Sequence, residues 1–394
     1  MKHKVYFYTL CLFGVAYFTI IESCYTGQAN LNSNKVYNID FGSDTTVAKI
    51  ALGEKLFFDR RLSANGTKSC ATCHSPTFAF TDGYRRSLGI YADEVRHNAP
   101  TLINTKFYAS LTWANPNVKS YEQQAETPLF ARHPPEMGLS SDDDTPLRRL
   151  SLDAAYRHLF KAAFGNSVSE TAALIPPEVK KNNKNKKENT RQQADNIGYL
   201  FTYTHVLAAL AAFESTLVSF QSQYDQYVAG DTTALSASAK RGQALFFSTR
   251  LQCGECHPPP LFSDADQAGK YHNVGLYCMD SIGSYPAHDE GLYEYTHQIG
   301  DKGKFRTPTL RNVALTAPYM HDGSISNLAA AIRIFEEGGQ WVKNGPQSGN
   351  GRQNPNKDPR ITGFELSNQE RADLIAFLYS LTDTTLNKRI KAYF

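Results

Sequence analysis

The sequence predicts an all-α fold built from two copies of one structural unit, with long loops between the helices. Apolar residues recur with helical spacing over residues 47–57, 203–220 and 237–247, and no segment alternates apolar and polar side chains as a half-buried strand does. Six residues near the first of these segments recur with a constant offset of 189 positions: Gly53, Leu56, Phe57, Phe58, Arg61 and Leu62 match Gly242, Leu245, Phe246, Phe247, Arg250 and Leu251. Self-similarity of this kind indicates an internal duplication.

A fourth helix is predicted near the C-terminus, where Ser367 and Glu370 form a capping box ahead of Leu374, Phe377 and Leu378. Stretches rich in glycine and proline, such as residues 258–260 and 345–355, are expected to be loops. The chain has 394 residues, which allows two or three domains. Its 41 basic and 38 acidic residues give a net charge of +3, which argues against a nucleic-acid-binding protein.

The N-terminal segment 1–24 has the layout of an export signal. Lys2 and Lys4 precede an apolar run over residues 5–21, and the polar stretch 25–44 that follows is expected to be a linker. An uncleaved membrane anchor is the alternative, because the apolar run is close to the minimum length for a spanning helix. Residues 21–24 also resemble a bacterial lipoprotein box, in which case Cys24 would carry a lipid and tether the mature protein to a membrane.

The repeats suggest two domains, residues 45–228 and 229–394. Within the first, the stretch 178–193 is rich in lysine and asparagine and lacks apolar periodicity. We interpret it as a solvated surface loop rather than a binding patch.

Each repeat is followed by a Cys-x-x-Cys-His motif, Cys70–Cys73–His74 in the first and Cys253–Cys256–His257 in the second. This spacing is typical of covalent c-type haem attachment. The two thiols form thioethers with the porphyrin, the histidine binds the iron, and its other ring nitrogen is expected to donate to a backbone carbonyl. A zinc site would not need histidine after both pairs, and a redox-active pair belongs beside a βαβ unit, which the sequence lacks. Two covalently bound haem c groups are therefore predicted.

Two haems are compatible with an enzyme or with a simple electron-transfer cytochrome, in which each iron has two protein ligands. The long loops favour an enzyme, because they exceed what a minimal cytochrome needs. A more specific indication comes from these stretches outside the haem motifs: Leu62-Ser-x-Asn-Gly66, Phe80-Thr-Asp-Gly83, Asn98-Ala-Pro100-Thr, Leu111-Thr-Trp113-Ala, Glu122-Gln-Gln124-Ala, Pro134-Pro-Glu136-Met137-Gly138 and the run from Phe305 to Gly323. Over residues 45–382 the chain resembles the bacterial di-haem cytochrome c peroxidase and MauG family, most of all its MauG-like (MbnH-like) branch.

The resemblance implies a role for several residues of the first unit. His74 would bind the peroxidatic haem, whose other face is open to hydrogen peroxide. Glu136 would be the acid–base group, with Gln124 and Pro128 lining the pocket, because a carboxylate can move a proton between the two peroxide oxygens. Trp113 would lie between the two haems as a relay for electrons. Taken alone, Glu136 could equally be a surface carboxylate and Trp113 a core side chain.

The resemblance also implies roles in the second unit. His257 would bind the electron-transfer haem. Asn98 and the carbonyls of Thr316 and Pro318 match a calcium site, and all-oxygen ligation suits that cation. Arg306 and Arg311 are candidate partners of the haem propionates, with ordinary ion pairs as the alternative.

Two positions depart from the family pattern. A histidine that caps the peroxidatic iron in most peroxidases is replaced near Ile90, and His97 falls where the family has arginine. We therefore expect an enzyme that needs no reductive activation. The methionine or tyrosine that completes the second iron is replaced by Phe335, which cannot bind iron. Met320 is the favoured substitute, with the alternatives His321, Met279, His272 or a five-coordinate iron.

The sequence thus predicts an exported, periplasmic di-haem peroxidase. It would reduce hydrogen peroxide at the N-terminal haem with electrons passed through the C-terminal haem from a small cytochrome c or cupredoxin. One alternative is a MauG-like enzyme that uses peroxide to oxidise tryptophan or another aromatic residue of a partner protein. Another is a non-enzymatic electron-transfer cytochrome. No nucleic-acid partner is expected, and membrane contact only through a lipid on Cys24.

Overall fold

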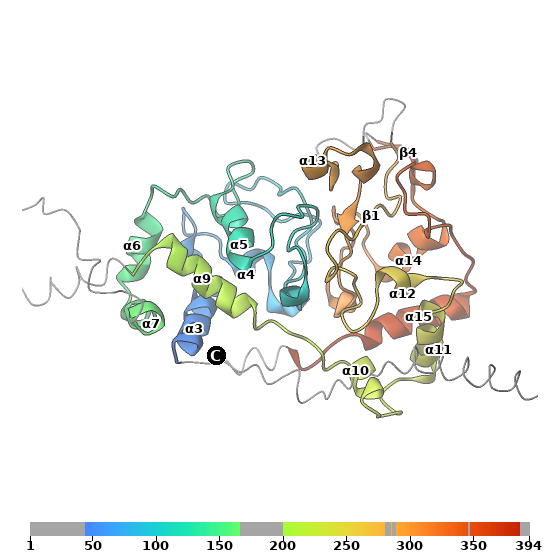
Figure 1. Cartoon of the computed structure of the whole chain (residues 1–394), viewed down its shortest axis with the longest axis horizontal. Helices are drawn as coiled ribbons and strands as arrows, with labels where there is room; N and C mark the ends of the chain where they lie inside the picture. Colours follow the sequence, from blue (N-terminus) through green and yellow to red (C-terminus); the bar gives the residue numbers. More distant parts are fainter. Residues whose placement is uncertain (1–43, 166–199, 280–284, 286–288, 346, 387–394) are drawn as a thin grey trace, which may run out of the picture. The chain divides into compact units, whose positions relative to one another are not determined.

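The computed structural model describes residues 44–165, 200–279, 285, 289–345 and 347–386 (Figure 1). The expected signal segment 1–24, the linker up to residue 43 and the lysine-rich loop 178–193 lie outside the described residues. Within the described ranges, no helix is both long enough and apolar enough to cross a membrane.

The described residues are mainly helical, as the sequence predicts. In the first half the helices are α3 (Asp44–Phe58), α4 (Cys70–Cys73), α5 (Tyr121–Phe130), α6 (Thr145–Ser151), α7 (Ala154–Phe164) and α9 (Tyr203–Glu214). In the second half they are α10 (Gln223–Val228), α11 (Ala237–Phe246), α12 (Cys253–Cys256), α13 (Tyr293–Thr296), α14 (Leu328–Glu336) and α15 (Asn368–Ser380).

Two small antiparallel sheets, each of two strands, depart from the prediction of no strand. They pair β1 (Tyr271–His272) with β2 (Phe305–Arg306), and β3 (Trp341–Val342) with β4 (Gly349–Asn350). Each strand has only two residues, so alternation along the sequence could not reveal it. Strand β4 of the second sheet lies within the predicted loop 345–355.

Each half contains one close helix crossing at a repeated glycine. Helix α3 packs on α9 at Gly53, and α11 packs on α15 at Gly242 (Figure 1). A Cβ atom on Gly53 would lie 1.9 Å from the carbonyl oxygen of Ala209, and one on Gly242 would lie 1.9 Å from that of Asp373. Only glycine allows the two backbones to approach this closely, which explains why the repeat keeps glycine at this place.

The aromatic packing around these crossings is also duplicated. The ring centroids of Phe57 and Phe80 are 6.0 Å apart, as are those of Phe246 and Phe262. Phe57 lies 5.2 Å from Phe213 of α9, and Phe246 lies 5.2 Å from its counterpart in α15, Phe377. The predicted duplication is therefore a duplication of core geometry.

A third buried cluster contains residues from both halves of the chain. Trp113 and Ala114 pack there with Leu276, Tyr277, Tyr285, Phe305, Ile325 and Ile334.

Most helix boundaries agree with the sequence. The capping box of α15 is present: Glu370 N donates to Ser367 Oγ (3.2 Å) and Ser367 N donates to Glu370 Oε2 (2.9 Å). Helix α9 ends at Glu214, short of the predicted residue 220. The following segment leaves the helix because its backbone bonds instead to Asn104, whose N–H donates to Leu217 O (2.8 Å) and whose Oδ1 accepts from Ser219 N (2.9 Å).

Candidate active site

The first haem motif forms one helical turn followed by a fixed histidine. Cys70 and Cys73 begin and end α4, and His74 follows as its C-cap. The ring Nδ1 of His74 lies 2.9 Å from the carbonyl oxygen of Phe80. A carbonyl can only accept, so Nδ1 carries the proton and Nε2 is left for the iron. Burial lowers the pKa of His74, which favours the neutral imidazole that binds metal.

The second motif repeats this arrangement. Cys253 and Cys256 bound α12, and Nδ1 of His257 lies 2.9 Å from the carbonyl oxygen of Phe262. Phe80 and Phe262 both have positive φ values, 63° and 51°, which turn their carbonyls toward the histidines. The expected hydrogen bond from each haem histidine to a backbone carbonyl is therefore present in both copies. None of the four cysteines of the motifs is in a disulfide, so all four are available for thioether attachment of haem.

A pocket of about 610 Å³, including its open mouth, lies beside the first motif. It brings together residues far apart in sequence: Cys70, Cys73 and His74 from the motif, Gln124 and Pro128 from α5, Glu136 from the loop after α5, and Leu210 and Glu214 from α9. The rest of its wall is mainly apolar, with Phe57, Leu88, Val95, Leu102, Ala125, Leu129 and Met137. Two thiols, an oriented imidazole and an apolar wall are the chemistry that a covalently bound haem requires.

The predicted acid–base residue Glu136 lies on a loop that is held on both sides. Met137 N donates to Pro128 O at the end of α5 (2.9 Å), and Ile90 N donates to Pro135 O (3.1 Å). Burial raises the pKa of Glu136, and the nearby His97 partly opposes that shift. The structure thus places a carboxyl group with raised proton affinity in the same pocket as His74.

Ile90 lies near the position at which the family resemblance implies an iron-capping histidine in most peroxidases. Its side chain is 8% exposed, and its Cδ1 lies 2.2 Å from the position that a Cβ atom on Gly138 would take. An aliphatic side chain here packs against the Glu136 loop and offers no ligand for iron.

Trp113 is buried in the third cluster. Its ring Nε1 donates to the carbonyl oxygen of Asn98 (2.9 Å), and its own carbonyl oxygen accepts from Arg306 N (2.8 Å). The Asn98 backbone N–H in turn donates to His321 O (2.8 Å). Trp113 is therefore fixed by backbone bonds to two segments of the chain, Asn98 and the β2 strand.

The predicted calcium ligands Asn98, Thr316 and Pro318 offer oxygen atoms, the type of ligand that calcium prefers. The side-chain nitrogen of Asn98 donates to Tyr84 O (2.9 Å), so the amide oxygen is the atom turned away from that bond. Thr316 and Pro318 lie near His321 in the sequence and are partly exposed. Amide and carbonyl oxygens are ligands that calcium accepts.

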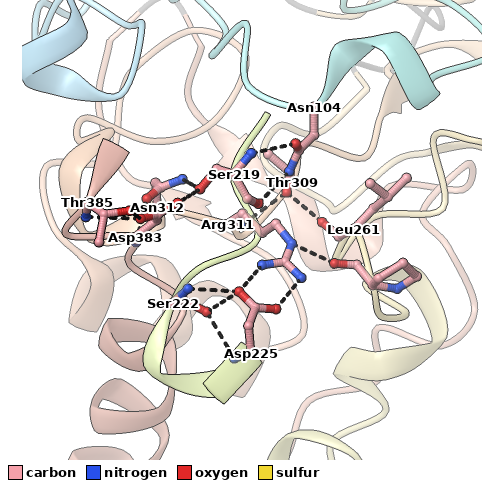
Figure 2. A network of polar contacts seen from close by, with 11 residues as sticks. Asn104, Ser219, Ser222, Asp225, Leu261, Thr309, Arg311, Asn312, Asp383 and Thr385 are labelled. Carbon is pink, nitrogen blue, oxygen red and sulfur yellow. Dashed lines mark hydrogen bonds and ion pairs between the residues drawn. The ribbon is translucent and has the colours of Figure 1, made fainter. Parts of the chain in front are cut away.

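The two arginines proposed as propionate partners behave differently. Arg311 makes a double ion pair with Asp225, at 2.8 and 2.9 Å, and donates to Pro260 O (Figure 2). Its guanidinium therefore makes the ion pair that was the alternative expectation, and a role as propionate partner stays a prediction. Arg306 donates to Thr112 O (2.9 Å) and its guanidinium lies 4.5 Å from the ring centre of Tyr108.

The candidates for the sixth ligand of the second iron also differ in their contacts with the rest of the protein. Phe335 lies on α14 and is partly buried. Both ring nitrogens of His272 bond to carboxylates, Asp358 at 2.7 Å and Asp264 at 2.8 Å, so neither is free for iron. The ring of His321 stacks on Phe305 with centroids 3.7 Å apart.

Two acidic residues of this region were not found from the sequence. Asp289 bonds His97 Nε2 (2.9 Å) and also lies 3.4 Å from His321 Nε2. Glu214, the last residue of α9, is 4% exposed and lines the pocket. The only sequence signal for Glu214 is a charged residue at the end of an otherwise apolar helix.

Comparisons with known proteins agree with this geometry. Residues 47–233 match the family described as di-haem cytochrome c peroxidase, and residues 297–382 match cytochrome c. The methylamine utilization protein MauG of Methylorubrum extorquens is 32% identical over 336 residues, which cover 85% of this chain and 78% of that protein. The cytochrome-c peroxidase IdrP1 of Denitromonas iodatirespirans is 30% identical over 366 residues, covering 86% and 82%.

A solved structure shows the same relationship. The crystal structure of a MauG-like protein associated with microbial copper homeostasis has a TM-score of 0.74 and 38% sequence identity, covering 86% of this chain and 90% of that chain. The predicted fold of two helical cytochrome c-type domains is confirmed by these matches. The chain belongs to the di-haem cytochrome c peroxidase and MauG family, and it is a c-type haem oxidoreductase that acts on peroxide.

Proposed function

We propose that this protein reduces hydrogen peroxide at the haem attached to Cys70 and Cys73, with Glu136 as the acid–base group. The observation that carries the proposal is the single pocket shared by His74, Gln124 and Glu136. Haem bound through Nε2 of His74 would supply the electrons and the open coordination position for peroxide.

Glu136 would accept a proton from one peroxide oxygen and return it to the other, which leaves as water. The raised pKa of this carboxyl suits the exchange, because a proton is best transferred by a group whose affinity lies near the operating pH. Gln124, on the α5 wall of the pocket, would orient the peroxide by hydrogen bonding.

The aliphatic Ile90 supports a site that is ready to react without prior reduction. Its backbone is tied to Pro135, directly before Glu136. The chain has isoleucine rather than histidine at this position, so no histidine from this loop position would bind the iron.

Trp113 would pass electrons between the two haems, which its burial and fixed ring orientation support. The donor would be a small cytochrome c or cupredoxin. A second candidate is the oxidation of aromatic residues on a partner protein, in the manner of MauG-like enzymes. Ile90 favours it, as does the 38% identity with a MauG-like protein associated with copper homeostasis.

For the second haem, bound through His257, we propose Met320 as the sixth ligand. The engagement of His272 by two carboxylates and the stacking of His321 on Phe305 leave the two methionines as the better candidates. Met279 Sδ already accepts from Asn356 Nδ2 at 3.5 Å, which favours Met320. A Met320→Leu variant should lose the spectral signature of a methionine-ligated haem, whereas Met279→Leu should keep it.

We further propose calcium binding at Asn98, Thr316 and Pro318, and a periplasmic location with export through residues 1–24. Lipid attachment at Cys24 would be tested by the intact mass of the mature protein, which also shows whether the signal segment has been removed.

One titration tests the catalytic proposal. The ferric protein is treated with stoichiometric hydrogen peroxide and its electronic spectrum is recorded. A high-spin component that peroxide removes supports the enzyme, and two low-spin haems that do not respond would indicate an electron-transfer cytochrome. Turnover with reduced cytochrome c or cupredoxin favours the small donor. Mass spectrometry that finds oxidised tryptophan on a protein captured after peroxide treatment favours the partner-protein substrate.

A further inference from the structure

The haem pocket contains a second carboxyl group besides Glu136. Glu214 is 4% exposed, ends helix α9 and lines the pocket one turn after Leu210, another lining residue. Its Oε2 atom is buried and has no hydrogen-bond partner among the described residues. A buried carboxyl oxygen without a partner is costly, so a group in the filled pocket or a water molecule is expected to bond it.

The surroundings of Glu214 keep it protonated at neutral pH. Burial, and to a smaller extent the charge of Glu122, together raise the pKa of Glu214 to about 8. Burial also raises the pKa of two titratable groups that interact with Glu214, the Cys70 thiol of α4 and the Tyr121 phenol of α5. Cys70 would be a thioether in the haem-bound protein, and Tyr121 is held by Thr105 Oγ1 at 3.0 Å.

Peroxide reduction needs a supply of protons. Each hydrogen peroxide takes up two electrons and two protons and yields two water molecules. Glu136 can move a proton from one oxygen to the other, but this shuttle brings no proton into the pocket from outside. A protonated acid that reaches both the pocket and a solvent-exposed group would provide that supply.

Glu122 is the exposed group in question. It lies in the first turn of α5, which packs against α9, and it is exposed to solvent. Gln124, two residues after Glu122 on α5, lines the same pocket as Glu214, so the first turn of α5 extends from the solvent to the pocket.

We propose that Glu122 and Glu214 form the route by which protons enter the peroxidatic pocket. Glu214 donates its carboxyl proton to the pocket twice in each reaction cycle, where the second peroxide oxygen takes up both protons and two electrons and becomes water. After each donation Glu214 is reprotonated from solvent through Glu122. The electrons come from the donor that the peroxidase reaction already requires. The inference rests on the proposed reduction of peroxide at this pocket and adds to it the origin of the protons.

The test measures proton uptake itself. The haem-loaded protein is mixed with hydrogen peroxide and reduced donor in a weakly buffered solution with a pH-indicator dye, and dye and haem absorbance are followed in a stopped-flow instrument. Glu214→Gln keeps the shape of the side chain but removes its acid. We expect proton uptake at least about tenfold slower, within the usual range for general acid catalysis.

Two matched variants control the measurement. Glu54→Gln changes another buried glutamate with an unpartnered oxygen, on α3, that does not line the pocket. Glu126→Gln changes an exposed glutamate of α5 one turn after Glu122. Both should take up protons at the wild-type rate. Infrared spectra should show a protonated carboxyl band that is lost in Glu214→Gln and kept in Glu126→Gln.

Glu122→Gln gives an independent test, because an exposed substitution leaves the fold intact. We expect slower proton uptake that a small carboxylic acid in solution restores. Wild-type uptake rates in both Glu122→Gln and Glu214→Gln would overturn the route while leaving peroxide reduction in place. A wild-type protein that does not react with peroxide would instead contradict the proposed function.

Discussion

Asn104 and Asn312 occupy equivalent positions in the two haem units, and the side chains of both bond to Ser219 (Figure 2). Asn104 Nδ2 donates to the backbone oxygen of Ser219 at 3.0 Å, and Asn312 Nδ2 donates to its Oγ at 2.9 Å. Both asparagines have left-handed backbones, with φ values of 61° and 60°. One serine after α9 therefore joins the equivalent turns of the two units.

The Ser219 hydroxyl should contribute measurably to stability. Its Oγ accepts from Asn312 and donates to Asp383 Oδ2 at 3.0 Å, and the residue is 1% exposed. Ser219→Ala would leave a buried amide without its partner, so we expect a loss of about 1–3 kcal/mol in the free energy of unfolding. Urea unfolding of the haem-loaded protein measures it. Ser141→Ala, at an exposed hydroxyl, should change stability little, and equal effects of both variants would contradict this role.

The asparagine pair also shows what the sequence could have revealed. Residues 100–104 and 308–312 both have the sequence Pro-Thr-Leu-x-Asn. Each threonine hydroxyl donates to the backbone oxygen of the residue directly before Phe80 or Phe262: Thr101 to Ala79 and Thr309 to Leu261. This repeat has an offset of 208 rather than 189 because the second unit has a longer insertion between the motifs. A search at one fixed offset therefore misses it.

Local features were predictable from the sequence. The haem anchors and the capping box at Ser367 depend on neighbours within a few positions, and Gly53 and Gly242 were visible because the chain repeats itself. The pocket position of Glu214, the ion pair of Arg311 with Asp225 and the early end of α9 could not be predicted in this way. Each depends on a contact between residues distant in the chain, which no local pattern encodes.

The glycines at the two helix crossings should not tolerate a methyl group. A Cβ atom at Gly53 or Gly242 would lie 1.9 Å from a backbone oxygen of the opposite helix, so the helices would have to separate. We expect Gly53→Ala and Gly242→Ala each to lower the free energy of unfolding by about 1–3 kcal/mol or more. Thermal unfolding followed by circular dichroism measures this. Gly300→Ala, which meets no atom within 4 Å, is the control and should unfold like wild type.

Glu136→Gln should preserve both haem spectra and slow the reaction with peroxide by about 10²-fold or more, because the amide cannot accept the peroxide proton. The raised pKa of Glu136 sets the pH dependence. The carboxylate form accepts the proton, so the wild-type rate should fall as the pH is lowered through a pKa above the ordinary value of 4.5. Stopped-flow rates across pH measure both effects. Glu94→Gln, at an exposed carboxyl, should behave as wild type. An unchanged rate in Glu136→Gln would remove this residue from the mechanism.

Trp113→Phe should slow electron exchange between the haems several-fold and also destabilise the protein. The phenylalanine cannot donate to Asn98 O, which leaves a buried carbonyl unpaired at a cost of about 1–3 kcal/mol. The chain has one other tryptophan, Trp341, which is 58% exposed, so Trp341→Phe is a matched control. Reduction of the protein by a single-electron donor, followed at both haems, measures the exchange. Equal rates in the two variants would show that Trp113 has only a packing role.

Glu214 should make the stability of the protein depend on pH. Burial raises its pKa from the ordinary value of 4.5 to about 8, so the folded state binds its proton more tightly than the unfolded state does. The stabilising effect of that proton is complete below about pH 4.5 and is lost as the pH rises toward 8. Wild type should therefore lose up to a few kcal/mol relative to Glu214→Gln across this interval. Urea unfolding of the two haem-loaded proteins at several pH values measures the difference, with Glu126→Gln as the exposed control. If the stability of Glu214→Gln changed with pH as that of wild type does, Glu214 would be ionised in the folded protein and could not hold the proton that the proposed route requires.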